Sequence, residues 1–145
     1  KDYLDMMEKR ESFEGETPPE IFSKIKANLE EIKCSIDEIE VNESKPIGEL
    51  ACVLLDLKAW NALENYYLCK LQAAFNLLSY QKFGNITEKK EAINFLKDAL
   101  EFWKKLSEIG ASHLLPYKMG RVNQYFGWSL YTAEVEHDIQ LAQNI

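Results

Sequence analysis

Apolar residues recur at spacings of three and four along most of the chain, the period of an α-helix with one buried face. In the first such stretch they are Ile21, Ile25, Leu29, Ile32, Ile36 and Ile39. Thr17 stands just before it, with Pro18 at the first helical position and Glu20 three residues after the threonine. This combination is typical of a capped helix start. The pattern predicts a helix from 17 to about 40 and a turn over 41–46.

A second and longer helix is predicted over about 47–83. Its apolar residues form one stripe, interrupted only by Glu64: Leu50, Val53, Leu57, Trp60, Tyr67, Leu71, Ala74 and Leu78. Ser44 is the expected cap, and Gly84 suits the left-handed conformation that often ends a helix. At 1.5 Å per residue this helix would be about 55 Å long. We therefore expect it to be the central element, with its neighbours packed against its two halves.

Two further helices complete the prediction. Asn85 and Glu88 form the next capping pair, and the helix after them ends near Gly110. Its stripe consists of Ala92, Ile93, Leu96, Ala99, Leu100, Trp103 and Leu106. Residues 111–127 predict a long packed loop, and no period-two alternation indicates a strand. A last helix is expected over about 128–143, with Leu130, Val135, Ile139 and Ala142 facing inward.

These elements predict an all-α fold, an antiparallel bundle of about four helices with one long central helix. Residues 17–145 are expected to form a single helical-bundle domain, because that length is enough to bury a core. Residues 1–16 are polar and irregular, and they predict a lead-in segment with a short helix around 3–7.

Composition narrows the range of partners. The net charge is −7, which argues against nucleic acid or an anionic membrane as partner, since both favour a basic face. The longest uninterrupted apolar run, 50–55, is far shorter than the about 20 residues of a membrane span. The chain opens with Lys1 rather than Met, which we interpret as a fragment or a processed chain.

Residues that could carry chemistry form no complete set. Glu134 and His137 have the Glu-x-x-His spacing of di-iron bundles, but those sites need the motif twice and two more carboxylates. Ser112 and His113 lie in no nucleophile motif, and the acidic residues of 37–43 are typical of a solvated helix end. We predict no catalytic residue, no cofactor and no metal in this chain.

The cysteines are Cys34, Cys52 and Cys69, an odd number with no CxxC spacing. Such a set fits neither a disulfide scaffold nor a zinc site. Cys34 and Cys52 stand nine residues on either side of the turn near Glu43, so they should face each other at one height. A disulfide between them requires an unusually close helix pair and stays open.

The 117–128 loop contains several aromatic residues. Tyr117, Arg121, Tyr125 and Trp128 are the candidate surface-interaction residues, because tyrosine and tryptophan faces also bind sugars. Aromatic residues at helical spacing belong more often to the core, so we expect most of the aromatic residues outside this loop to be buried in the core.

Three stretches resemble the C-terminal helical region of large secreted bacterial proteins of the Bacteroides type, described as putative glycoside hydrolases or α-glucuronidase-like proteins. They are Trp60-x5-Tyr66-Tyr67-x2-Lys70-x2-Ala73-Ala74, Ala92-x3-Leu96-x2-Ala99-Leu100-x2-Trp103-Lys104-Lys105, and Tyr117-x3-Arg121 with Trp128-x6-Val135-x2-Asp138-Ile139. Leu106 departs from the pattern, which usually has tyrosine there.

The resemblance implies a non-catalytic accessory domain of a larger carbohydrate-active protein, located in the periplasm or outside the cell. Its partners would be other domains of the same polypeptide, and its role structural or interactive. Two alternatives stay open. One is a tetratricopeptide-like module that binds a protein, although no recurrence of about 34 residues is present. The other is a glycan-binding module that uses the 117–128 loop. The oligomeric state is not determined.

Overall fold

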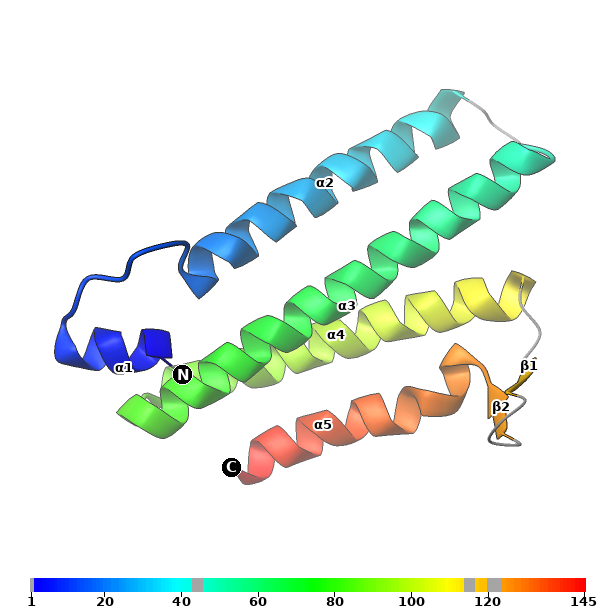
Figure 1. The fold of residues 1–145 in the computed structure, drawn as a ribbon. Helices are drawn as coiled ribbons and strands as arrows, with labels where there is room; N and C mark the ends of the chain where they lie inside the picture. Colours follow the sequence, from blue (N-terminus) through cyan, green and yellow to red (C-terminus); the bar gives the residue numbers. More distant parts are fainter. Residues whose placement is uncertain (1, 43–45, 114–116, 120–123) are drawn as a thin grey trace.

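The computed structural model describes residues 2–42, 46–113, 117–119 and 124–145 (Figure 1). In order, these residues form α1 (Asp2–Lys9), α2 (Pro18–Asn42), α3 (Glu49–Phe83), α4 (Ile86–His113), β1 (Tyr117–Met119), β2 (Gln124–Phe126), the 3-10 helix η1 (Trp128–Tyr131) and α5 (Thr132–Asn144). The predicted all-α bundle with one long central helix is confirmed. None of the helices in the described ranges is both long and apolar enough to cross a membrane.

Local signals set most helix ends. The backbone N–H and the hydroxyl of Thr17 both donate to the Glu20 carboxylate at 2.8 Å, and these hydrogen bonds lower the pKa of Glu20. Gly84 adopts the left-handed conformation at φ 73° and donates to the Tyr80 carbonyl, as expected of a helix end. The start of α3 is later than predicted: the helix begins at Glu49, and Ser44, its expected cap, lies outside the described residues.

The prediction that the third helix stops near Gly110 is wrong, because α4 continues to His113. A Cβ on Gly110 would lie 2.7 Å from Cδ1 of Trp128, so the glycine makes room for this ring rather than ending the helix. Part of the predicted loop is an antiparallel hairpin, in which Tyr117 pairs with Phe126. Three-residue strands are too short to show the alternation by which strands are recognised.

The last predicted helix is divided in two. Its first four residues form η1, whose three residues per turn shift the side-chain phase relative to α5. Leu130, expected to face inward, is consequently 53% exposed. Val135 and Ala142 on α5 are buried as predicted, and Ile139 packs between them.

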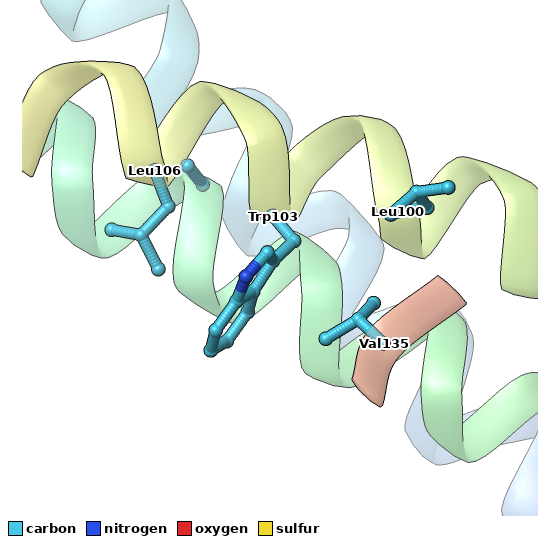
Figure 2. Packing of buried hydrophobic residues seen from close by; sticks show 5 residues of the cluster. Leu100, Trp103, Leu106 and Val135 are labelled. Atoms are coloured by element: carbon cyan, nitrogen blue, oxygen red, sulfur yellow. The ribbon is translucent and has the colours of Figure 1, made fainter. Parts of the chain in front are cut away.

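The core lies between α3, α4 and α5. One cluster joins Ala62, Leu100, Trp103, Leu106 and Val135 (Figure 2), and the other joins Ala73, Ala92, Leu96 and Ala142. The predicted inward stripe of α4 is confirmed, with Ile93 the one member that is only half-buried. Alanines with almost no exposed surface let the α3 and α4 backbones approach closely, which increases dispersion contact between them.

α2 and α4 each lie alongside most of α3, so the prediction that each covers one half of it is wrong (Figure 1). On the α2 side, Glu40 pairs with Lys58 near one end, and Phe22 contacts Phe75 near the other at 5.9 Å between ring centroids. The short turns make consecutive helices antiparallel over their shared length rather than dividing α3 between them.

α1 packs near the C-terminal end of α3, and it confirms the short helix predicted around residues 3–7. Leu4 is buried, and the Lys82 ammonium pairs with Asp5 and, at 2.8 Å, with Glu8. Hydrogen bonds to Asp5 and Glu8 raise the pKa of Lys82, so the lysine remains a cation.

Candidate functional site

A groove of about 840 Å³ runs between α2 and α4, with α3 as its floor. Apolar side chains of all three helices line it, among them Leu29, Leu68 and Phe102. Some of the polar side chains in the groove form hydrogen bonds within the chain. The Asn61 amide donates to the Leu29 carbonyl at 3.3 Å, and the Asn65 amide donates to the Asn61 carbonyl at 2.8 Å.

Charges along the groove have both signs, and four of them form two ion pairs. Lys33 binds Asp37 at 3.1 Å, and Lys58 pairs with Glu40. Because neither sign dominates, the groove lacks the one-signed field that concentrates an anionic or cationic ligand. The arrangement is that of a cleft of mixed charge between packed helices.

Cys69 lies on the groove floor and is buried. Burial, with a smaller contribution from the charge of Asp98, raises the pKa of its thiol to about 11. Because the thiolate is the nucleophilic form, this cysteine is unsuited to nucleophilic catalysis at neutral pH. Cys34 and Cys52 are exposed and carry free thiols, so the structure contains no disulfide between them.

We expect two of the three thiols, Cys34 and Cys52, to react within minutes with a coloured disulfide reagent at about pH 8. Cys69 should react only after denaturant is added, because its raised pKa favours the neutral thiol in the folded chain. The same shift contributes stability that is complete below the unfolded thiol pKa of 9.0 and is lost as the pH rises through about 11. In the control variant Cys69→Ala, both fast thiols should remain and the slow one disappear. Three fast thiols in the native protein would show that Cys69 is accessible.

The predicted interaction residues of the 117–128 loop separate in the structure. Tyr125, on β2, is 59% exposed. Trp128 belongs to the core edge: its carbonyl accepts the Trp103 indole N–H at 3.1 Å, and the two rings lie 5.5 Å apart. Tyr117 takes part in the hairpin through its backbone, and Arg121 lies outside the described residues. Among the described side chains of these candidates, the structure therefore joins Trp128 to the packing and leaves Tyr125 exposed to solvent.

The described residues weighed for metal or acid–base chemistry do not form a cluster that could bind a metal ion. In the described part of the chain, no group of three or more His, Cys, Asp or Glu side chains could hold a metal ion. His137 places Nδ1 3.3 Å from the Gln140 amide oxygen, and both His137 and Glu134 are exposed. Glu40 pairs with Lys58, as an ordinary surface ion pair does.

The largest departure from the sequence-based prediction concerns α3. The apolar row predicted to face inward is exposed along its whole length, from 38% at Leu57 to 61% at Trp60. We name these residues the α3 stripe: Leu50, Val53, Leu57, Trp60, Tyr67, Leu71, Ala74 and Leu78. The buried side of the same helix carries mainly smaller or polar residues, including Cys69, Ala73 and Asn76, together with Leu54 and Leu68.

The physical reason is that α3 has apolar residues on all sides, so its periodicity does not identify the face that meets α4. A helix that is apolar all round is typically covered all round. Here α4 covers one face of α3, with α2 and α5 beside it, and the α3 stripe lies in solvent. Sequence reasoning recognised these residues as a row and misjudged what covers them. The usable signal was the row of small residues on the opposite face.

Comparison with known proteins adds no relative: no family model, curated protein or solved structure matches this chain. The resemblance to helical regions of carbohydrate-active proteins therefore stays a prediction.

Proposed function

We propose that this chain is a non-catalytic accessory domain with an interaction role, and that it binds another α-helix through the α3 stripe. The observation that carries the proposal is the exposure of an apolar row from Leu50 to Leu78, interrupted only by Glu64. At 1.5 Å per residue the row is about 42 Å long. Folded proteins rarely expose contiguous apolar patches of this kind unless the patch is a contact surface.

The spacing of the α3 stripe favours a helical partner. From Leu50 onward its members alternate by three and four residues through four heptads, with Glu64 as the one polar member of the series. This is the a/d pattern of a coiled-coil seam, in which each apolar side chain enters a hole between four residues of the facing helix. A sugar or a nucleic acid would not require such a spacing.

The alternatives have weaker support. Helices of 25, 35 and 28 residues without an internal repeat are unlike the equal hairpins of a tetratricopeptide array. A glycan platform in the 117–128 loop would rest on Tyr125 alone among the described side chains that were candidates, because Trp128 is engaged in packing. The carbohydrate-active parent protein and the location outside the cytoplasm remain part of the proposal through the sequence resemblance.

Photo-crosslinking tests the proposal. A photoreactive phenylalanine analogue would replace Trp60 in the protein produced in the cells that naturally make it, and Tyr125 in a matched control. The two rings are similarly exposed, at 61% and 59%, but only Trp60 belongs to the α3 stripe. We expect an adduct at position 60 whose cross-linked peptide, identified by mass spectrometry, has apolar residues every three or four positions. This holds for a partner in another molecule or in another part of the same polypeptide. No adduct at position 60, or the same adducts at both positions, would sink the proposal.

A further inference from the structure

We infer that the partner of the α3 stripe is a second copy of the same stripe, bound as an antiparallel two-helix coiled coil around a twofold axis. This inference rests on the proposed function and adds the identity of the partner. Cyclic twofold dimers are the commonest symmetric assemblies, and they require a surface patch that is complementary to itself. The α3 stripe meets this requirement in area, access and residue order.

The area is sufficient. Taken together, the exposed parts of the stripe residues amount to roughly 700 Å², close to the about 800 Å² per partner of a standard specific interface. Trp60 and Tyr67, at 61% and 57% exposed, contribute the largest shares, and aromatic residues of this kind often dominate binding energy.

The surface is also accessible. Lys58, to one side of the stripe, holds α2 through Glu40, and Lys70, to the other side, holds α5 through Asp138. The core contacts of α3 with α4 lie on the face opposite the stripe. An approaching helix therefore meets α3 directly, between α2 and α5, with α1 beside the C-terminal end of the stripe, where Lys82 holds it.

Glu64 favours the antiparallel orientation. It occupies the middle of the seam, so a parallel dimer in register would place the two Glu64 carboxylates against each other in an apolar interface. Two like charges without a counter-ion there are costly. In an antiparallel dimer, a positions face d positions, so Glu64 faces a different residue and the two Glu64 side chains are offset by three residues, about 4.5 Å along the axis.

One antiparallel register places every stripe residue opposite a residue of α3 in the other copy. In that register, residue n faces residue 131 − n, and the overlap extends from Leu50 to Gln81, within the bounds of α3. Its layers are Val53 with Leu78, Leu57 with Ala74, Trp60 with Leu71, and Glu64 with Tyr67 of the second copy. The small Ala74 leaves room beside the large Trp60, and the Tyr67 hydroxyl can donate to the Glu64 carboxylate. Shifting the register by one heptad moves an end of the stripe past the end of α3.

The mass of the purified chain in solution tests the dimer. Light scattering at tens of micromolar should give twice 16.8 kDa. The double variant Leu57→Glu/Leu71→Glu introduces charges into four layers and should give 16.8 kDa with unchanged helix content by circular dichroism. The matched control is Leu130→Glu/Leu141→Glu, which changes two leucines that are 53% and 50% exposed but lie outside the stripe. It should remain a dimer, and a monomeric wild-type protein would overturn the inference.

The orientation is tested with a spin label on the exposed Cys52, in a Cys34→Ser background in which the buried Cys69 is protected. In the inferred register Cys52 lies at the level of Ser79 of the second copy along the helix axis, 27 positions away from its own number. The two labels should therefore be about 40 Å apart, against about 10 Å in a parallel dimer. A distance near 10 Å would overturn the antiparallel order, and one near 30 Å would overturn the register.

The two proposals fail separately. A monomeric wild-type chain together with a position-60 adduct to a helix of another molecule or domain would overturn the second copy and leave the proposed function standing. A monomeric chain without any adduct at position 60 would overturn both.

Discussion

Replacing Trp103 with alanine is expected to lower the free energy of unfolding by about 4 kcal/mol. Trp103 is 8% exposed and joins three elements, α3, α4 and η1. Its ring lies 4.9 Å from that of Tyr66 and 5.5 Å from that of Trp128, between centroids. Removing it leaves a cavity and also deprives the Trp128 carbonyl of the indole N–H. Urea unfolding followed by circular dichroism measures the effect.

Two further substitutions separate the causes. Trp103→Phe keeps an aromatic ring and loses the indole donor, so it should cost about 2 kcal/mol, between wild type and Trp103→Ala. Trp60→Ala removes a tryptophan that is 61% exposed, and should cost less than about 1 kcal/mol in the dilute protein. Equal losses for Trp60→Ala and Trp103→Ala would contradict the placement of the two side chains.

The second large effect is expected for Leu106→Ala, which should lower the free energy of unfolding by about 3 kcal/mol. Leu106 is 2% exposed, and in Figure 2 it lies in the same cluster as Trp103, Leu100 and Val135. The loss combines the transfer free energy of the removed atoms with the cavity that remains, since the surrounding rings can collapse only partly.

Leu71→Ala is the matched control for Leu106→Ala, because it makes the same chemical change at a side chain that is 51% exposed. At nanomolar concentration the protein is too dilute to associate through the α3 stripe. There Leu71→Ala should lower the free energy of unfolding by less than about 1 kcal/mol. At tens of micromolar the cost should rise, because a dimer that loses a leucine from its seam adds less to apparent stability. A loss like that of Leu106→Ala at every concentration would place Leu71 in the core.

Much of the fold could be predicted because its signals are local. A capping threonine and glutamate mark the start of α2, and Gly84 marks the end of α3, since each supplies a conformation or a hydrogen bond that a helix end needs. The apolar stripe of α4 also identified the buried face of this helix correctly, because polar residues occupy the opposite side and only one face can be buried.

Gly110 and Leu130 show where local signals mislead. Glycine favours helix ends by its conformational freedom, but Gly110 is needed for the space occupied by the Trp128 ring, which comes from another element. Leu130 fits a helical period until the chain adopts a 3-10 turn there, which moves the side chain to solvent. Neither effect can be predicted from the residues next to Gly110 or Leu130 in the sequence.

The candidate site, too, was predicted only in part from local signals. The sequence by itself determined that the chain forms long helices, where most of them begin and end, and that α3 carries a row of apolar residues, most of them large, with Glu64 as its one polar member. Only the tertiary structure decided which face of α3 is buried. An apolar row is equally suited to a core and to a partner, and the choice depends on where α4 can approach most closely. It does so over Ala73 and its small neighbours, where the backbones gain the most contact, and the larger side chains of the α3 stripe are thereby left exposed.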